Sequence, residues 1–109
     1  MITEYVAGFS FSEDRKRVIL IEKQKPLWQA GRFNAVGGKI EEGETPQTAM
    51  EREFEEETGA SLQDWEQFCI YKGKDWVVYF FKRFGDTEYC SMEEEEIFCV
   101  TLEDAASLP

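Results

Sequence analysis

The sequence contains no histidine, and this absence removes several kinds of active site together. Ser-His-Asp triads, histidine general bases and zinc ions held by imidazole all depend on that side chain. A metal ion bound by this chain therefore has to be held by oxygen ligands. That preference is typical of magnesium, with manganese as the alternative.

Cysteine is also scarce. The three cysteines, Cys69, Cys90 and Cys99, are odd in number and form no C-x-x-C pair, so neither a disulfide framework nor a zinc site is predicted. Reduced thiols packed as small hydrophobic groups are expected. The sequence shows neither a signal peptide nor an apolar run of membrane-spanning length, and we therefore expect a cytoplasmic protein that does not enter a membrane.

Basic residues are few relative to acidic ones. The chain has 12 Lys and Arg against 23 Asp and Glu, which gives a formal net charge of -11. A field of that sign repels nucleic-acid polymers and anionic membranes, but it allows a small phosphorylated ligand if a cation mediates the contact. Solubility alone explains the charge equally well.

The length and the pattern of apolar residues predict one domain that spans residues 1–109. Hydrophobic residues make up 42% of the 109, which is enough for a small core. Mixed strands arranged around one strong helix indicate an α+β fold. Strands are expected at residues 5–11, 17–22, 65–71, 76–84 and 98–102, with a further short apolar stretch at 33–36.

The helix has clear signals at both ends. Thr45 is a suitable N-cap, Pro46 fits the first helical position, and Gly59 supplies the C-terminal glycine. At about 100° per residue, Met50 and Phe54 fall on the side that would face the sheet. The predicted helix therefore runs from residue 46 to residue 58.

Glutamates gather on another side of this helix. Glu53, Glu56 and Glu57 lie within an arc of about 100°, where like charges at these spacings repel one another. A divalent cation over the arc would offset the repulsion, and Arg52 on its flank can hold a carboxylate in a bidentate fork. The alternative is an ordinary glutamate-rich helix face in contact with solvent.

The segment from Gly38 to Ala60 resembles the box that defines the Nudix hydrolase family. That box reads G-x5-E-x7-R-E-U-x-E-E-x-G-U, where U is a bulky apolar residue. Every charged and glycine position matches; Phe54 is aromatic where an aliphatic residue is usual, and Ala60 is smaller than usual. The matching residues are Gly38, Glu44, Arg52, Glu53, Glu56, Glu57 and Gly59.

The resemblance implies a Nudix fold: an α/β/α sandwich within the α+β class, with a mixed sheet and a loop–helix–loop metal site. Carried over residue by residue, Glu53, Glu56 and Glu57 would bind Mg²⁺, or Mn²⁺, together with the carbonyl of Gly37. Arg52 and Glu44 would brace the loop and orient Glu53. The reaction would be attack of a metal-activated water on a phosphorus of a nucleoside diphosphate linkage.

The general base in this family is a box glutamate or a glutamate from a later loop. The acidic run at residues 93–96 precedes the last expected strand, and Glu96 is our candidate. A solvated acidic loop is the alternative interpretation of the same run.

The stretch at 31–39 resembles the nucleoside-triphosphate branch of the family, which includes enzymes that sanitise oxidised purine nucleotides. Asn34 is expected to contact the base, Phe33 and Trp28 to stack on it, and Lys39 and the amide of Gly38 to meet phosphate. Core packing for Phe33, a loop anchor for Trp28 and solvation for Lys39 are the alternatives. ADP-ribose, a dinucleotide polyphosphate or a nucleotide sugar stay open as substrates, as does a non-catalytic nucleotide-binding module.

Relatives in this family usually continue into a C-terminal helix, whereas the sequence stops at Pro109. The sequence could be a minimal version of the fold or a fragment of a longer chain. A monomer or a homodimer is expected, and dimerisation would offset a missing helix.

Overall fold

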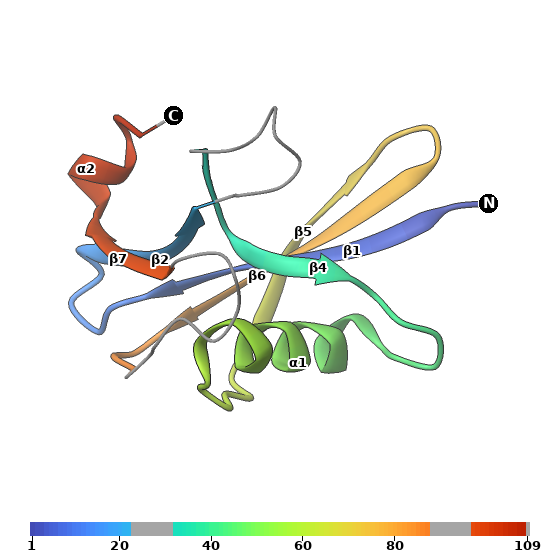
Figure 1. The fold of residues 1–109 in the computed structure, drawn as a ribbon, viewed down its shortest axis with the longest axis horizontal. Helices are drawn as coiled ribbons and strands as arrows, with labels where there is room; N and C mark the ends of the chain where they lie inside the picture. The colour runs from blue at the N-terminus through green and yellow to red at the C-terminus, as the bar shows by residue number, and fades with distance from the viewer. Residues whose placement is uncertain (23–31, 88–96, 109) are drawn as a thin grey trace.

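The computed structural model describes residues 1–22, 32–87 and 97–108, which form one seven-stranded mixed sheet with two helices (Figure 1). The long helix, α1, lies under one face of the sheet, and the short helix α2 lies near the other face at one end. The helices are α1 (Pro46–Thr58) and α2 (Leu102–Ala105). The strands are β1 (Thr3–Phe11), β2 (Arg17–Glu22), β3 (Phe33–Asn34), β4 (Val36–Lys39), β5 (Glu66–Lys72), β6 (Trp76–Phe84) and β7 (Ile97–Thr101).

The strand order is β3-β2-β1-β6-β5, with β4 paired to β1 and β7 paired to β2. Only the β1–β6 pair is parallel among the described strands, which makes the sheet mixed as expected. The expected apolar stretch at 33–36 is in fact two short strands with Ala35 between them. The last strand lies one residue earlier than predicted, and the residues after it form α2.

One edge of β1 is shared between two strands. β6 occupies the other edge along its whole length, so β4 and β2 must divide what is left. β4 pairs with the first part, up to Gly8 opposite Val36, and β2 joins at Phe11 opposite Val18. The sheet therefore forks beside Phe9.

The core lies between α1 and the sheet. Burial alternates along β1, where Val6 and Ser10 are buried, as expected for a strand with one covered face. Met50 and Phe54 of α1 have no exposed surface, which confirms the predicted sheet-facing side of the helix. Gly8 permits this contact, because a β-carbon there would lie 2.7 Å from the sulfur of Met50.

The helix begins and ends where its capping residues predict. The Thr45 hydroxyl accepts from the backbone N–H of Thr48, and the Thr48 hydroxyl accepts from that of Thr45, which completes a capping box. Gly59 adopts a left-handed conformation at φ 80° and donates its N–H to the Glu55 carbonyl at 2.8 Å. Within the described residues, no helix combines the length and apolar character needed to cross a membrane.

A buried arginine ties β6 to its neighbours. The Arg83 guanidinium donates to Asp64 Oδ1 at 2.7 Å, to Ser10 Oγ at 2.6 Å and to the Gly85 carbonyl at 3.0 Å. The hydrogen bond from Arg83 lowers the pKa of Asp64. A buried cation needs such partners, because losing one leaves a donor desolvated without an acceptor.

We predict that Asp64→Ala lowers the free energy of unfolding by about 1 kcal/mol. This is at the low end for removal of a hydrogen-bond partner from a buried group, because water reaches the half-exposed carboxylate. The folded pKa of Asp64 lies below its unfolded value, so the contribution is present above the unfolded pKa and is lost as the pH falls through the folded one. Urea unfolding at pH 7 and at pH 3 measures both effects. Glu103→Ala, at an exposed position, is the control; an equal loss in both variants would contradict the prediction.

Candidate active site

The first metal-ligand candidate, Glu53, lies against the glycine that opens the Nudix-type box. Its side chain is 12% exposed. A β-carbon at Gly38 would lie 2.5 Å from the Glu53 carboxylate, so only glycine fits at that position without moving Glu53. β4 and α1 thus meet at this pair of residues.

Arg52 holds the site together through four hydrogen-bonding partners. Nε and Nη2 donate to the two carboxylate oxygens of Glu44 at 2.7 and 2.9 Å, which is a bidentate pair. Nη2 also donates to the Lys39 carbonyl at 3.1 Å, and Nη1 donates to Glu53 Oε1 at 2.9 Å. The fourth partner is Glu56, whose carboxylate oxygens accept from Nη1 at 3.2 and 3.3 Å.

Glu44 also binds the backbone of the loop that precedes the helix. Its Oε1 accepts the backbone N–H of Glu41 at 2.9 Å. The same carboxylate therefore binds the loop backbone and the Arg52 guanidinium. This is the arrangement that the predicted bracing roles of Glu44 and Arg52 require.

The pKa values of Glu44 and Glu53 are shifted in opposite directions. The hydrogen bond from Arg52 lowers the pKa of Glu44 and, in return, raises that of Arg52. The pKa of Glu53 is raised, because loss of solvation by burial outweighs the favourable contact with Arg52. A desolvated carboxylate of this kind gains from a further cation close to it.

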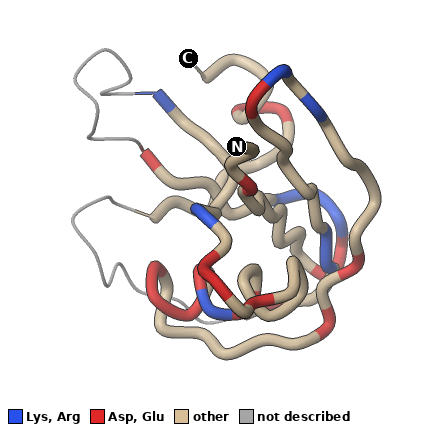
Figure 2. The backbone as a smooth tube through the Cα atoms, turned by 90° about the vertical axis from the view of Figure 1, so that its right-hand side faces the viewer, with Lys and Arg blue, Asp and Glu red and all other residues tan. Residues whose placement is uncertain are grey.

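The donor set fits a hard divalent cation in its chemistry. The candidate ligands are the carboxylates of Glu53, Glu56 and Glu57 and the carbonyl of Gly37, all of them oxygen donors. One carboxylate oxygen of Glu57 is buried, whereas the Glu56 side chain is 49% exposed. Acidic residues gather along α1 and the loop before it (Figure 2).

No group of three or more acidic, histidine or cysteine side chains converges into a ready metal site anywhere in residues 1–22, 32–87 and 97–108. Arg52 explains this at the helix, because its guanidinium contacts both Glu53 and Glu56 and holds them in ion pairs. Arg52 contacts Glu53 through Oε1 alone, so Glu53 could bind a metal ion through its other oxygen while keeping that contact. Glu56 accepts from Arg52 through both oxygens and would have to turn toward the ion.

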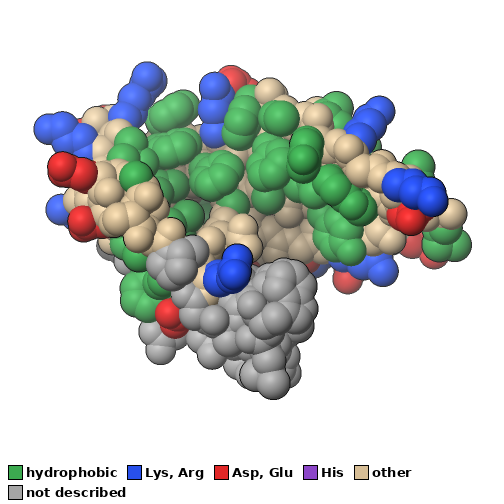
Figure 3. Space-filling view, turned by 90° about the horizontal axis from the view of Figure 1, so that it is seen from above, with side chains coloured by type: hydrophobic (Ala, Val, Ile, Leu, Met, Phe, Trp, Pro, Cys, Tyr) green, Lys and Arg blue, Asp and Glu red, His purple; other side chains and the backbone are tan. Residues whose placement is uncertain are grey.

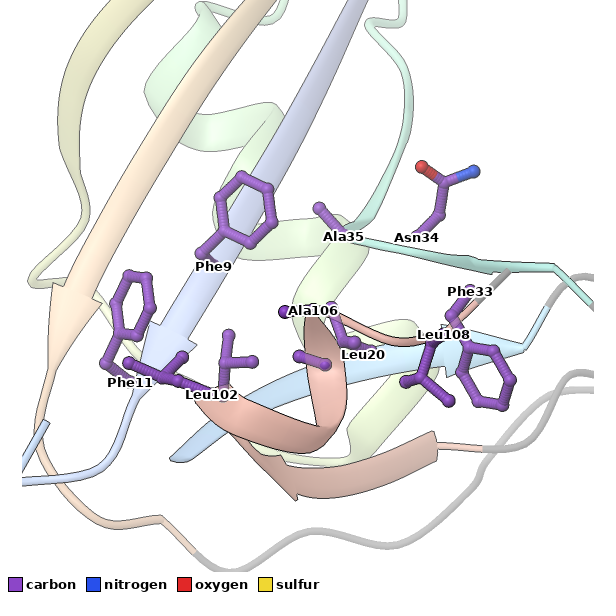
Figure 4. Close-up of a pocket in the computed structure, with 11 residues that line it drawn as sticks. Phe9, Phe11, Leu20, Phe33, Asn34, Ala35, Leu102, Ala106 and Leu108 are labelled. Atoms are coloured by element: carbon purple, nitrogen blue, oxygen red, sulfur yellow. The ribbon is translucent and has the colours of Figure 1, made fainter. Parts of the chain in front are cut away.

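A largely apolar pocket of about 450 Å³ lies at the fork of the sheet (Figure 4). Phe9 and Phe11 of β1 form one wall, and Phe33 with Leu108 lies across from them. The remaining lining residues are Val18, Leu20, Asn34, Ala35, Leu102, Ala105 and Ala106. An apolar pocket with a single amide side chain suits a flat, mostly apolar ligand group with a polar edge.

The structure brings two of the predicted substrate residues, Phe33 and Asn34, to this pocket. The Asn34 carboxamide points away from the Phe33 ring, as neighbouring side chains in a strand do. Lys39 lies elsewhere, opposite Tyr5 at the far end of β4, in a hollow lined by the N-terminal residues and the loop before α1. Trp28 and Glu96 lie outside the described residues.

Sequence reasoning missed the β1 wall of the pocket. Phe9 and Phe11 alternate with the buried residues of β1, so they face the side of the sheet away from α1. The available signal was that both faces of the expected strand at 5–11 carry apolar residues. In such a strand, both faces are covered by other parts of the protein or contact a ligand.

β4 connects the pocket to the carboxylates. Ala35 lines the pocket and Gly38 touches Glu53, which places them three residues, or about 10 Å, apart along the chain. The pocket and the carboxylates therefore adjoin the same strand.

Comparison with known proteins agrees with the Nudix-type sequence box and with the fold described above. The family model described as NUDIX domain matches residues 2–109. The chain belongs to the Nudix family. This confirms the family and the fold class that the sequence predicts, and Nudix enzymes generally use divalent metal ions.

Individual relatives are similar over different extents. The mouse (Mus musculus) oxidized purine nucleoside triphosphate hydrolase is 43% identical over 44 residues, which cover 40% of this chain and 28% of that enzyme. The MutT structure from work on Aliivibrio salmonicida and Vibrio cholerae superposes with a TM-score of 0.89 at 25% identity, over 100% of this chain and 87% of that one. The Nudix domain of Shewanella oneidensis NrtR, solved with ADP-ribose, has a TM-score of 0.86 at 18% identity over 100% and 79% of the two chains, and so shares the fold alone.

The contact between Gly38 and Glu53 can be tested by a double-mutant cycle. We expect Gly38→Ala to cost about 1–3 kcal/mol of stability, because the new methyl group overlaps the Glu53 carboxylate. In a Glu53→Ala background most of that cost should vanish. Urea unfolding of the four proteins measures it, and an equal cost in both backgrounds would show that Gly38 is needed for another reason.

Proposed function

We propose that the chain is a Mg²⁺-dependent nucleotide pyrophosphohydrolase that converts a nucleoside or deoxynucleoside triphosphate into the monophosphate and pyrophosphate. The observation that carries this proposal is the pair of sites that β4 links: an apolar pocket with Asn34 at one end and the Arg52-braced glutamates at the other. The local similarity to the mouse hydrolase of oxidised purine nucleoside triphosphates supports a purine triphosphate as the substrate.

The residues divide the work between recognition and positioning. Phe33 and the β1 phenylalanines offer aromatic surface to a base, and Asn34 offers an amide that can both donate and accept. Arg52 and Glu44 fix the backbone around Lys39 and hold Glu53 in one orientation. The amide of Gly38 and the side chain of Lys39 are proposed phosphate contacts.

When Mg²⁺ is bound by Glu53, Glu56, Glu57 and the Gly37 carbonyl, it would supply charge neutralisation at the phosphates and a more acidic water. Each of these glutamates contributes a negative charge that holds the cation beside the diphosphate linkage. Water then adds to one of the two phosphorus atoms of the α,β-phosphoanhydride, its P–O bond breaks, and the leaving phosphate group keeps the bonding electrons. A box glutamate or Glu96 is the proposed acceptor of the proton from water.

The glutamate assignment predicts a selective loss of turnover. Glu53→Gln, Glu56→Gln and Glu57→Gln should each lower kcat/KM by about 100-fold or more, because each weakens a ligand of the metal. Glu55→Gln, at the exposed position between them, should stay within about threefold of the wild type. Circular dichroism of each variant checks that the fold is intact.

The assay is pyrophosphate or phosphate release with and without Mg²⁺. The panel should include canonical and oxidised deoxynucleoside triphosphates, ADP-ribose and diadenosine tetraphosphate. Metal-dependent turnover of a triphosphate supports the proposal. Turnover of ADP-ribose or of diadenosine tetraphosphate alone would contradict the proposed substrate but support the proposed hydrolysis of a diphosphate linkage. Binding of a nucleotide with no turnover would instead identify a binding module and overturn the proposal.

The pocket predicts a second, separable effect. Asn34→Ala should raise KM for the preferred triphosphate by about 2–10-fold with little change in kcat, because one hydrogen bond to the base is lost in ground and transition states alike. Gln67→Ala removes an exposed amide on β5 and is the matched control. A fall in kcat at unchanged KM would place Asn34 in the chemical step rather than in base binding.

A further inference from the structure

The pocket at the fork lies on the face of the sheet turned away from α1, which is rich in hydrophobic side chains (Figure 3). Its two aromatic sides are held by the backbone to different degrees. Phe9 belongs to β1, a nine-residue strand paired along its whole length to β6. Phe33 belongs to β3, which has only two residues, both paired to β2. Backbone pairing therefore fixes the Phe33 side of the pocket less firmly than the Phe9 side.

Phe33 has side-chain support from the opposite edge of β2. This strand has β3 on one edge and β7 on the other, because Ile21 is paired both to Asn34 and to Ile97. Phe98 of β7 meets Phe33 across β2, with 5.5 Å between the ring centroids and 65° between the ring planes. This is an edge-to-face pair, the geometry that the charge distribution of two aromatic rings favours.

Phe98 supports the pocket wall from behind. Of the described residues, those that line the pocket include Phe33 and Leu20 but not Phe98. Leu20 is the partner of Phe98 in the pairing of β2 with β7, so Phe98 lies one strand away from the lining. Turning the Phe33 side chain to another rotamer would break the edge-to-face contact. Phe98 can therefore influence a ligand in the pocket through the orientation of Phe33.

The effect of a fixed Phe33 ring depends on the size of the base. A flat base in the pocket would have Phe9 on one side and Phe33 across from it (Figure 4). Stacking on aromatic side chains strengthens with the area of overlap, and a purine has two fused rings where a pyrimidine has one. A Phe33 ring that could turn freely would therefore weaken binding of a purine more than binding of a pyrimidine.

We propose that Phe98 is a positioning residue that makes the pocket selective for purine bases, because it holds the Phe33 ring in place. Phe33 contacts the base, and Phe98 acts through Phe33. The proposal rests on the proposed function in one respect, that the pocket at the fork takes the base of a nucleotide. The contact between Phe98 and Phe33 itself is independent of the reaction.

Steady-state kinetics with one purine and one pyrimidine deoxynucleoside triphosphate test the proposal. Phe98→Leu keeps an apolar side chain but removes the flat ring. It should raise KM for the purine substrate about 3–10-fold with kcat unchanged, and KM for the pyrimidine by less than about twofold. Phe98→Tyr retains the ring at a partly exposed position and should stay within about twofold of the wild type. Phe68→Leu removes a ring of β5 that does not line the pocket and is the matched control.

A second background separates positioning from general damage to the fold. In a Phe33→Leu protein, Phe98→Leu should change KM by less than about twofold, because the ring that it positions is already absent. An undiminished effect in that background would overturn the proposal. So would a fall in kcat at unchanged KM, or an equal loss for the purine and the pyrimidine.

Calorimetric titration with deoxynucleoside monophosphates in the absence of Mg²⁺ distinguishes this proposal from the proposed function. If no triphosphate is hydrolysed, the proposed function fails, and the dissociation constants of the monophosphates then decide the role of Phe98. Phe98→Leu should raise the dissociation constant of the purine monophosphate about 3–10-fold and leave that of the pyrimidine unchanged. Equal purine affinity in the wild type and Phe98→Leu would overturn the proposal. Absence of both turnover and monophosphate binding in the wild type would also overturn it, since the pocket would then not be a base site.

Discussion

The active-site side of this molecule depends on one guanidinium group. Arg52 binds Glu44 from the loop, the Lys39 carbonyl from the end of β4, and Glu53 and Glu56 from its own helix. Its side chain is 22% exposed, so these charge-assisted hydrogen bonds are only partly screened by water. Without that cation the carboxylates would repel one another, and the loop would lose its connection to the helix.

The same group explains why carboxylates can be placed so close together before any metal arrives. Burial raises the pKa of Glu53, while the contact with Arg52 opposes that change. A lysine could neutralise the charge, but it lacks the planar fork that engages both oxygens of Glu44 and still reaches the Lys39 carbonyl. The site is therefore organised by an internal cation, the Arg52 guanidinium.

The fork in the sheet makes the second half of the site. Because β6 takes one edge of β1, β4 and β2 have to share the other, and the break at Ala35 lets the chain change from one partner to the next. The pocket opens at that change, and β4 runs from it to Glu53. The pocket and the glutamates thus lie on the two faces of one sheet, joined by a four-residue strand.

The sequence predicted what is encoded locally. The caps of α1 and its sheet-facing Met50 and Phe54 follow from spacing, and the structure agrees with them. Strand partners do not follow from spacing, because a β-strand presents the same backbone groups to any neighbour. For that reason neither the fork nor the pocket wall at Phe9 was predicted, and the site was expected as a list of residues rather than as two connected halves.

The net charge of the whole chain is a poor guide to what one part of its surface attracts. The total of -11 suits a site that takes up a cation and, through it, a phosphate. Beyond one Debye length, about 8 Å in physiological salt, that total is largely screened. The charges within a few ångströms then matter more than the total, and at α1 these are the glutamates around Arg52.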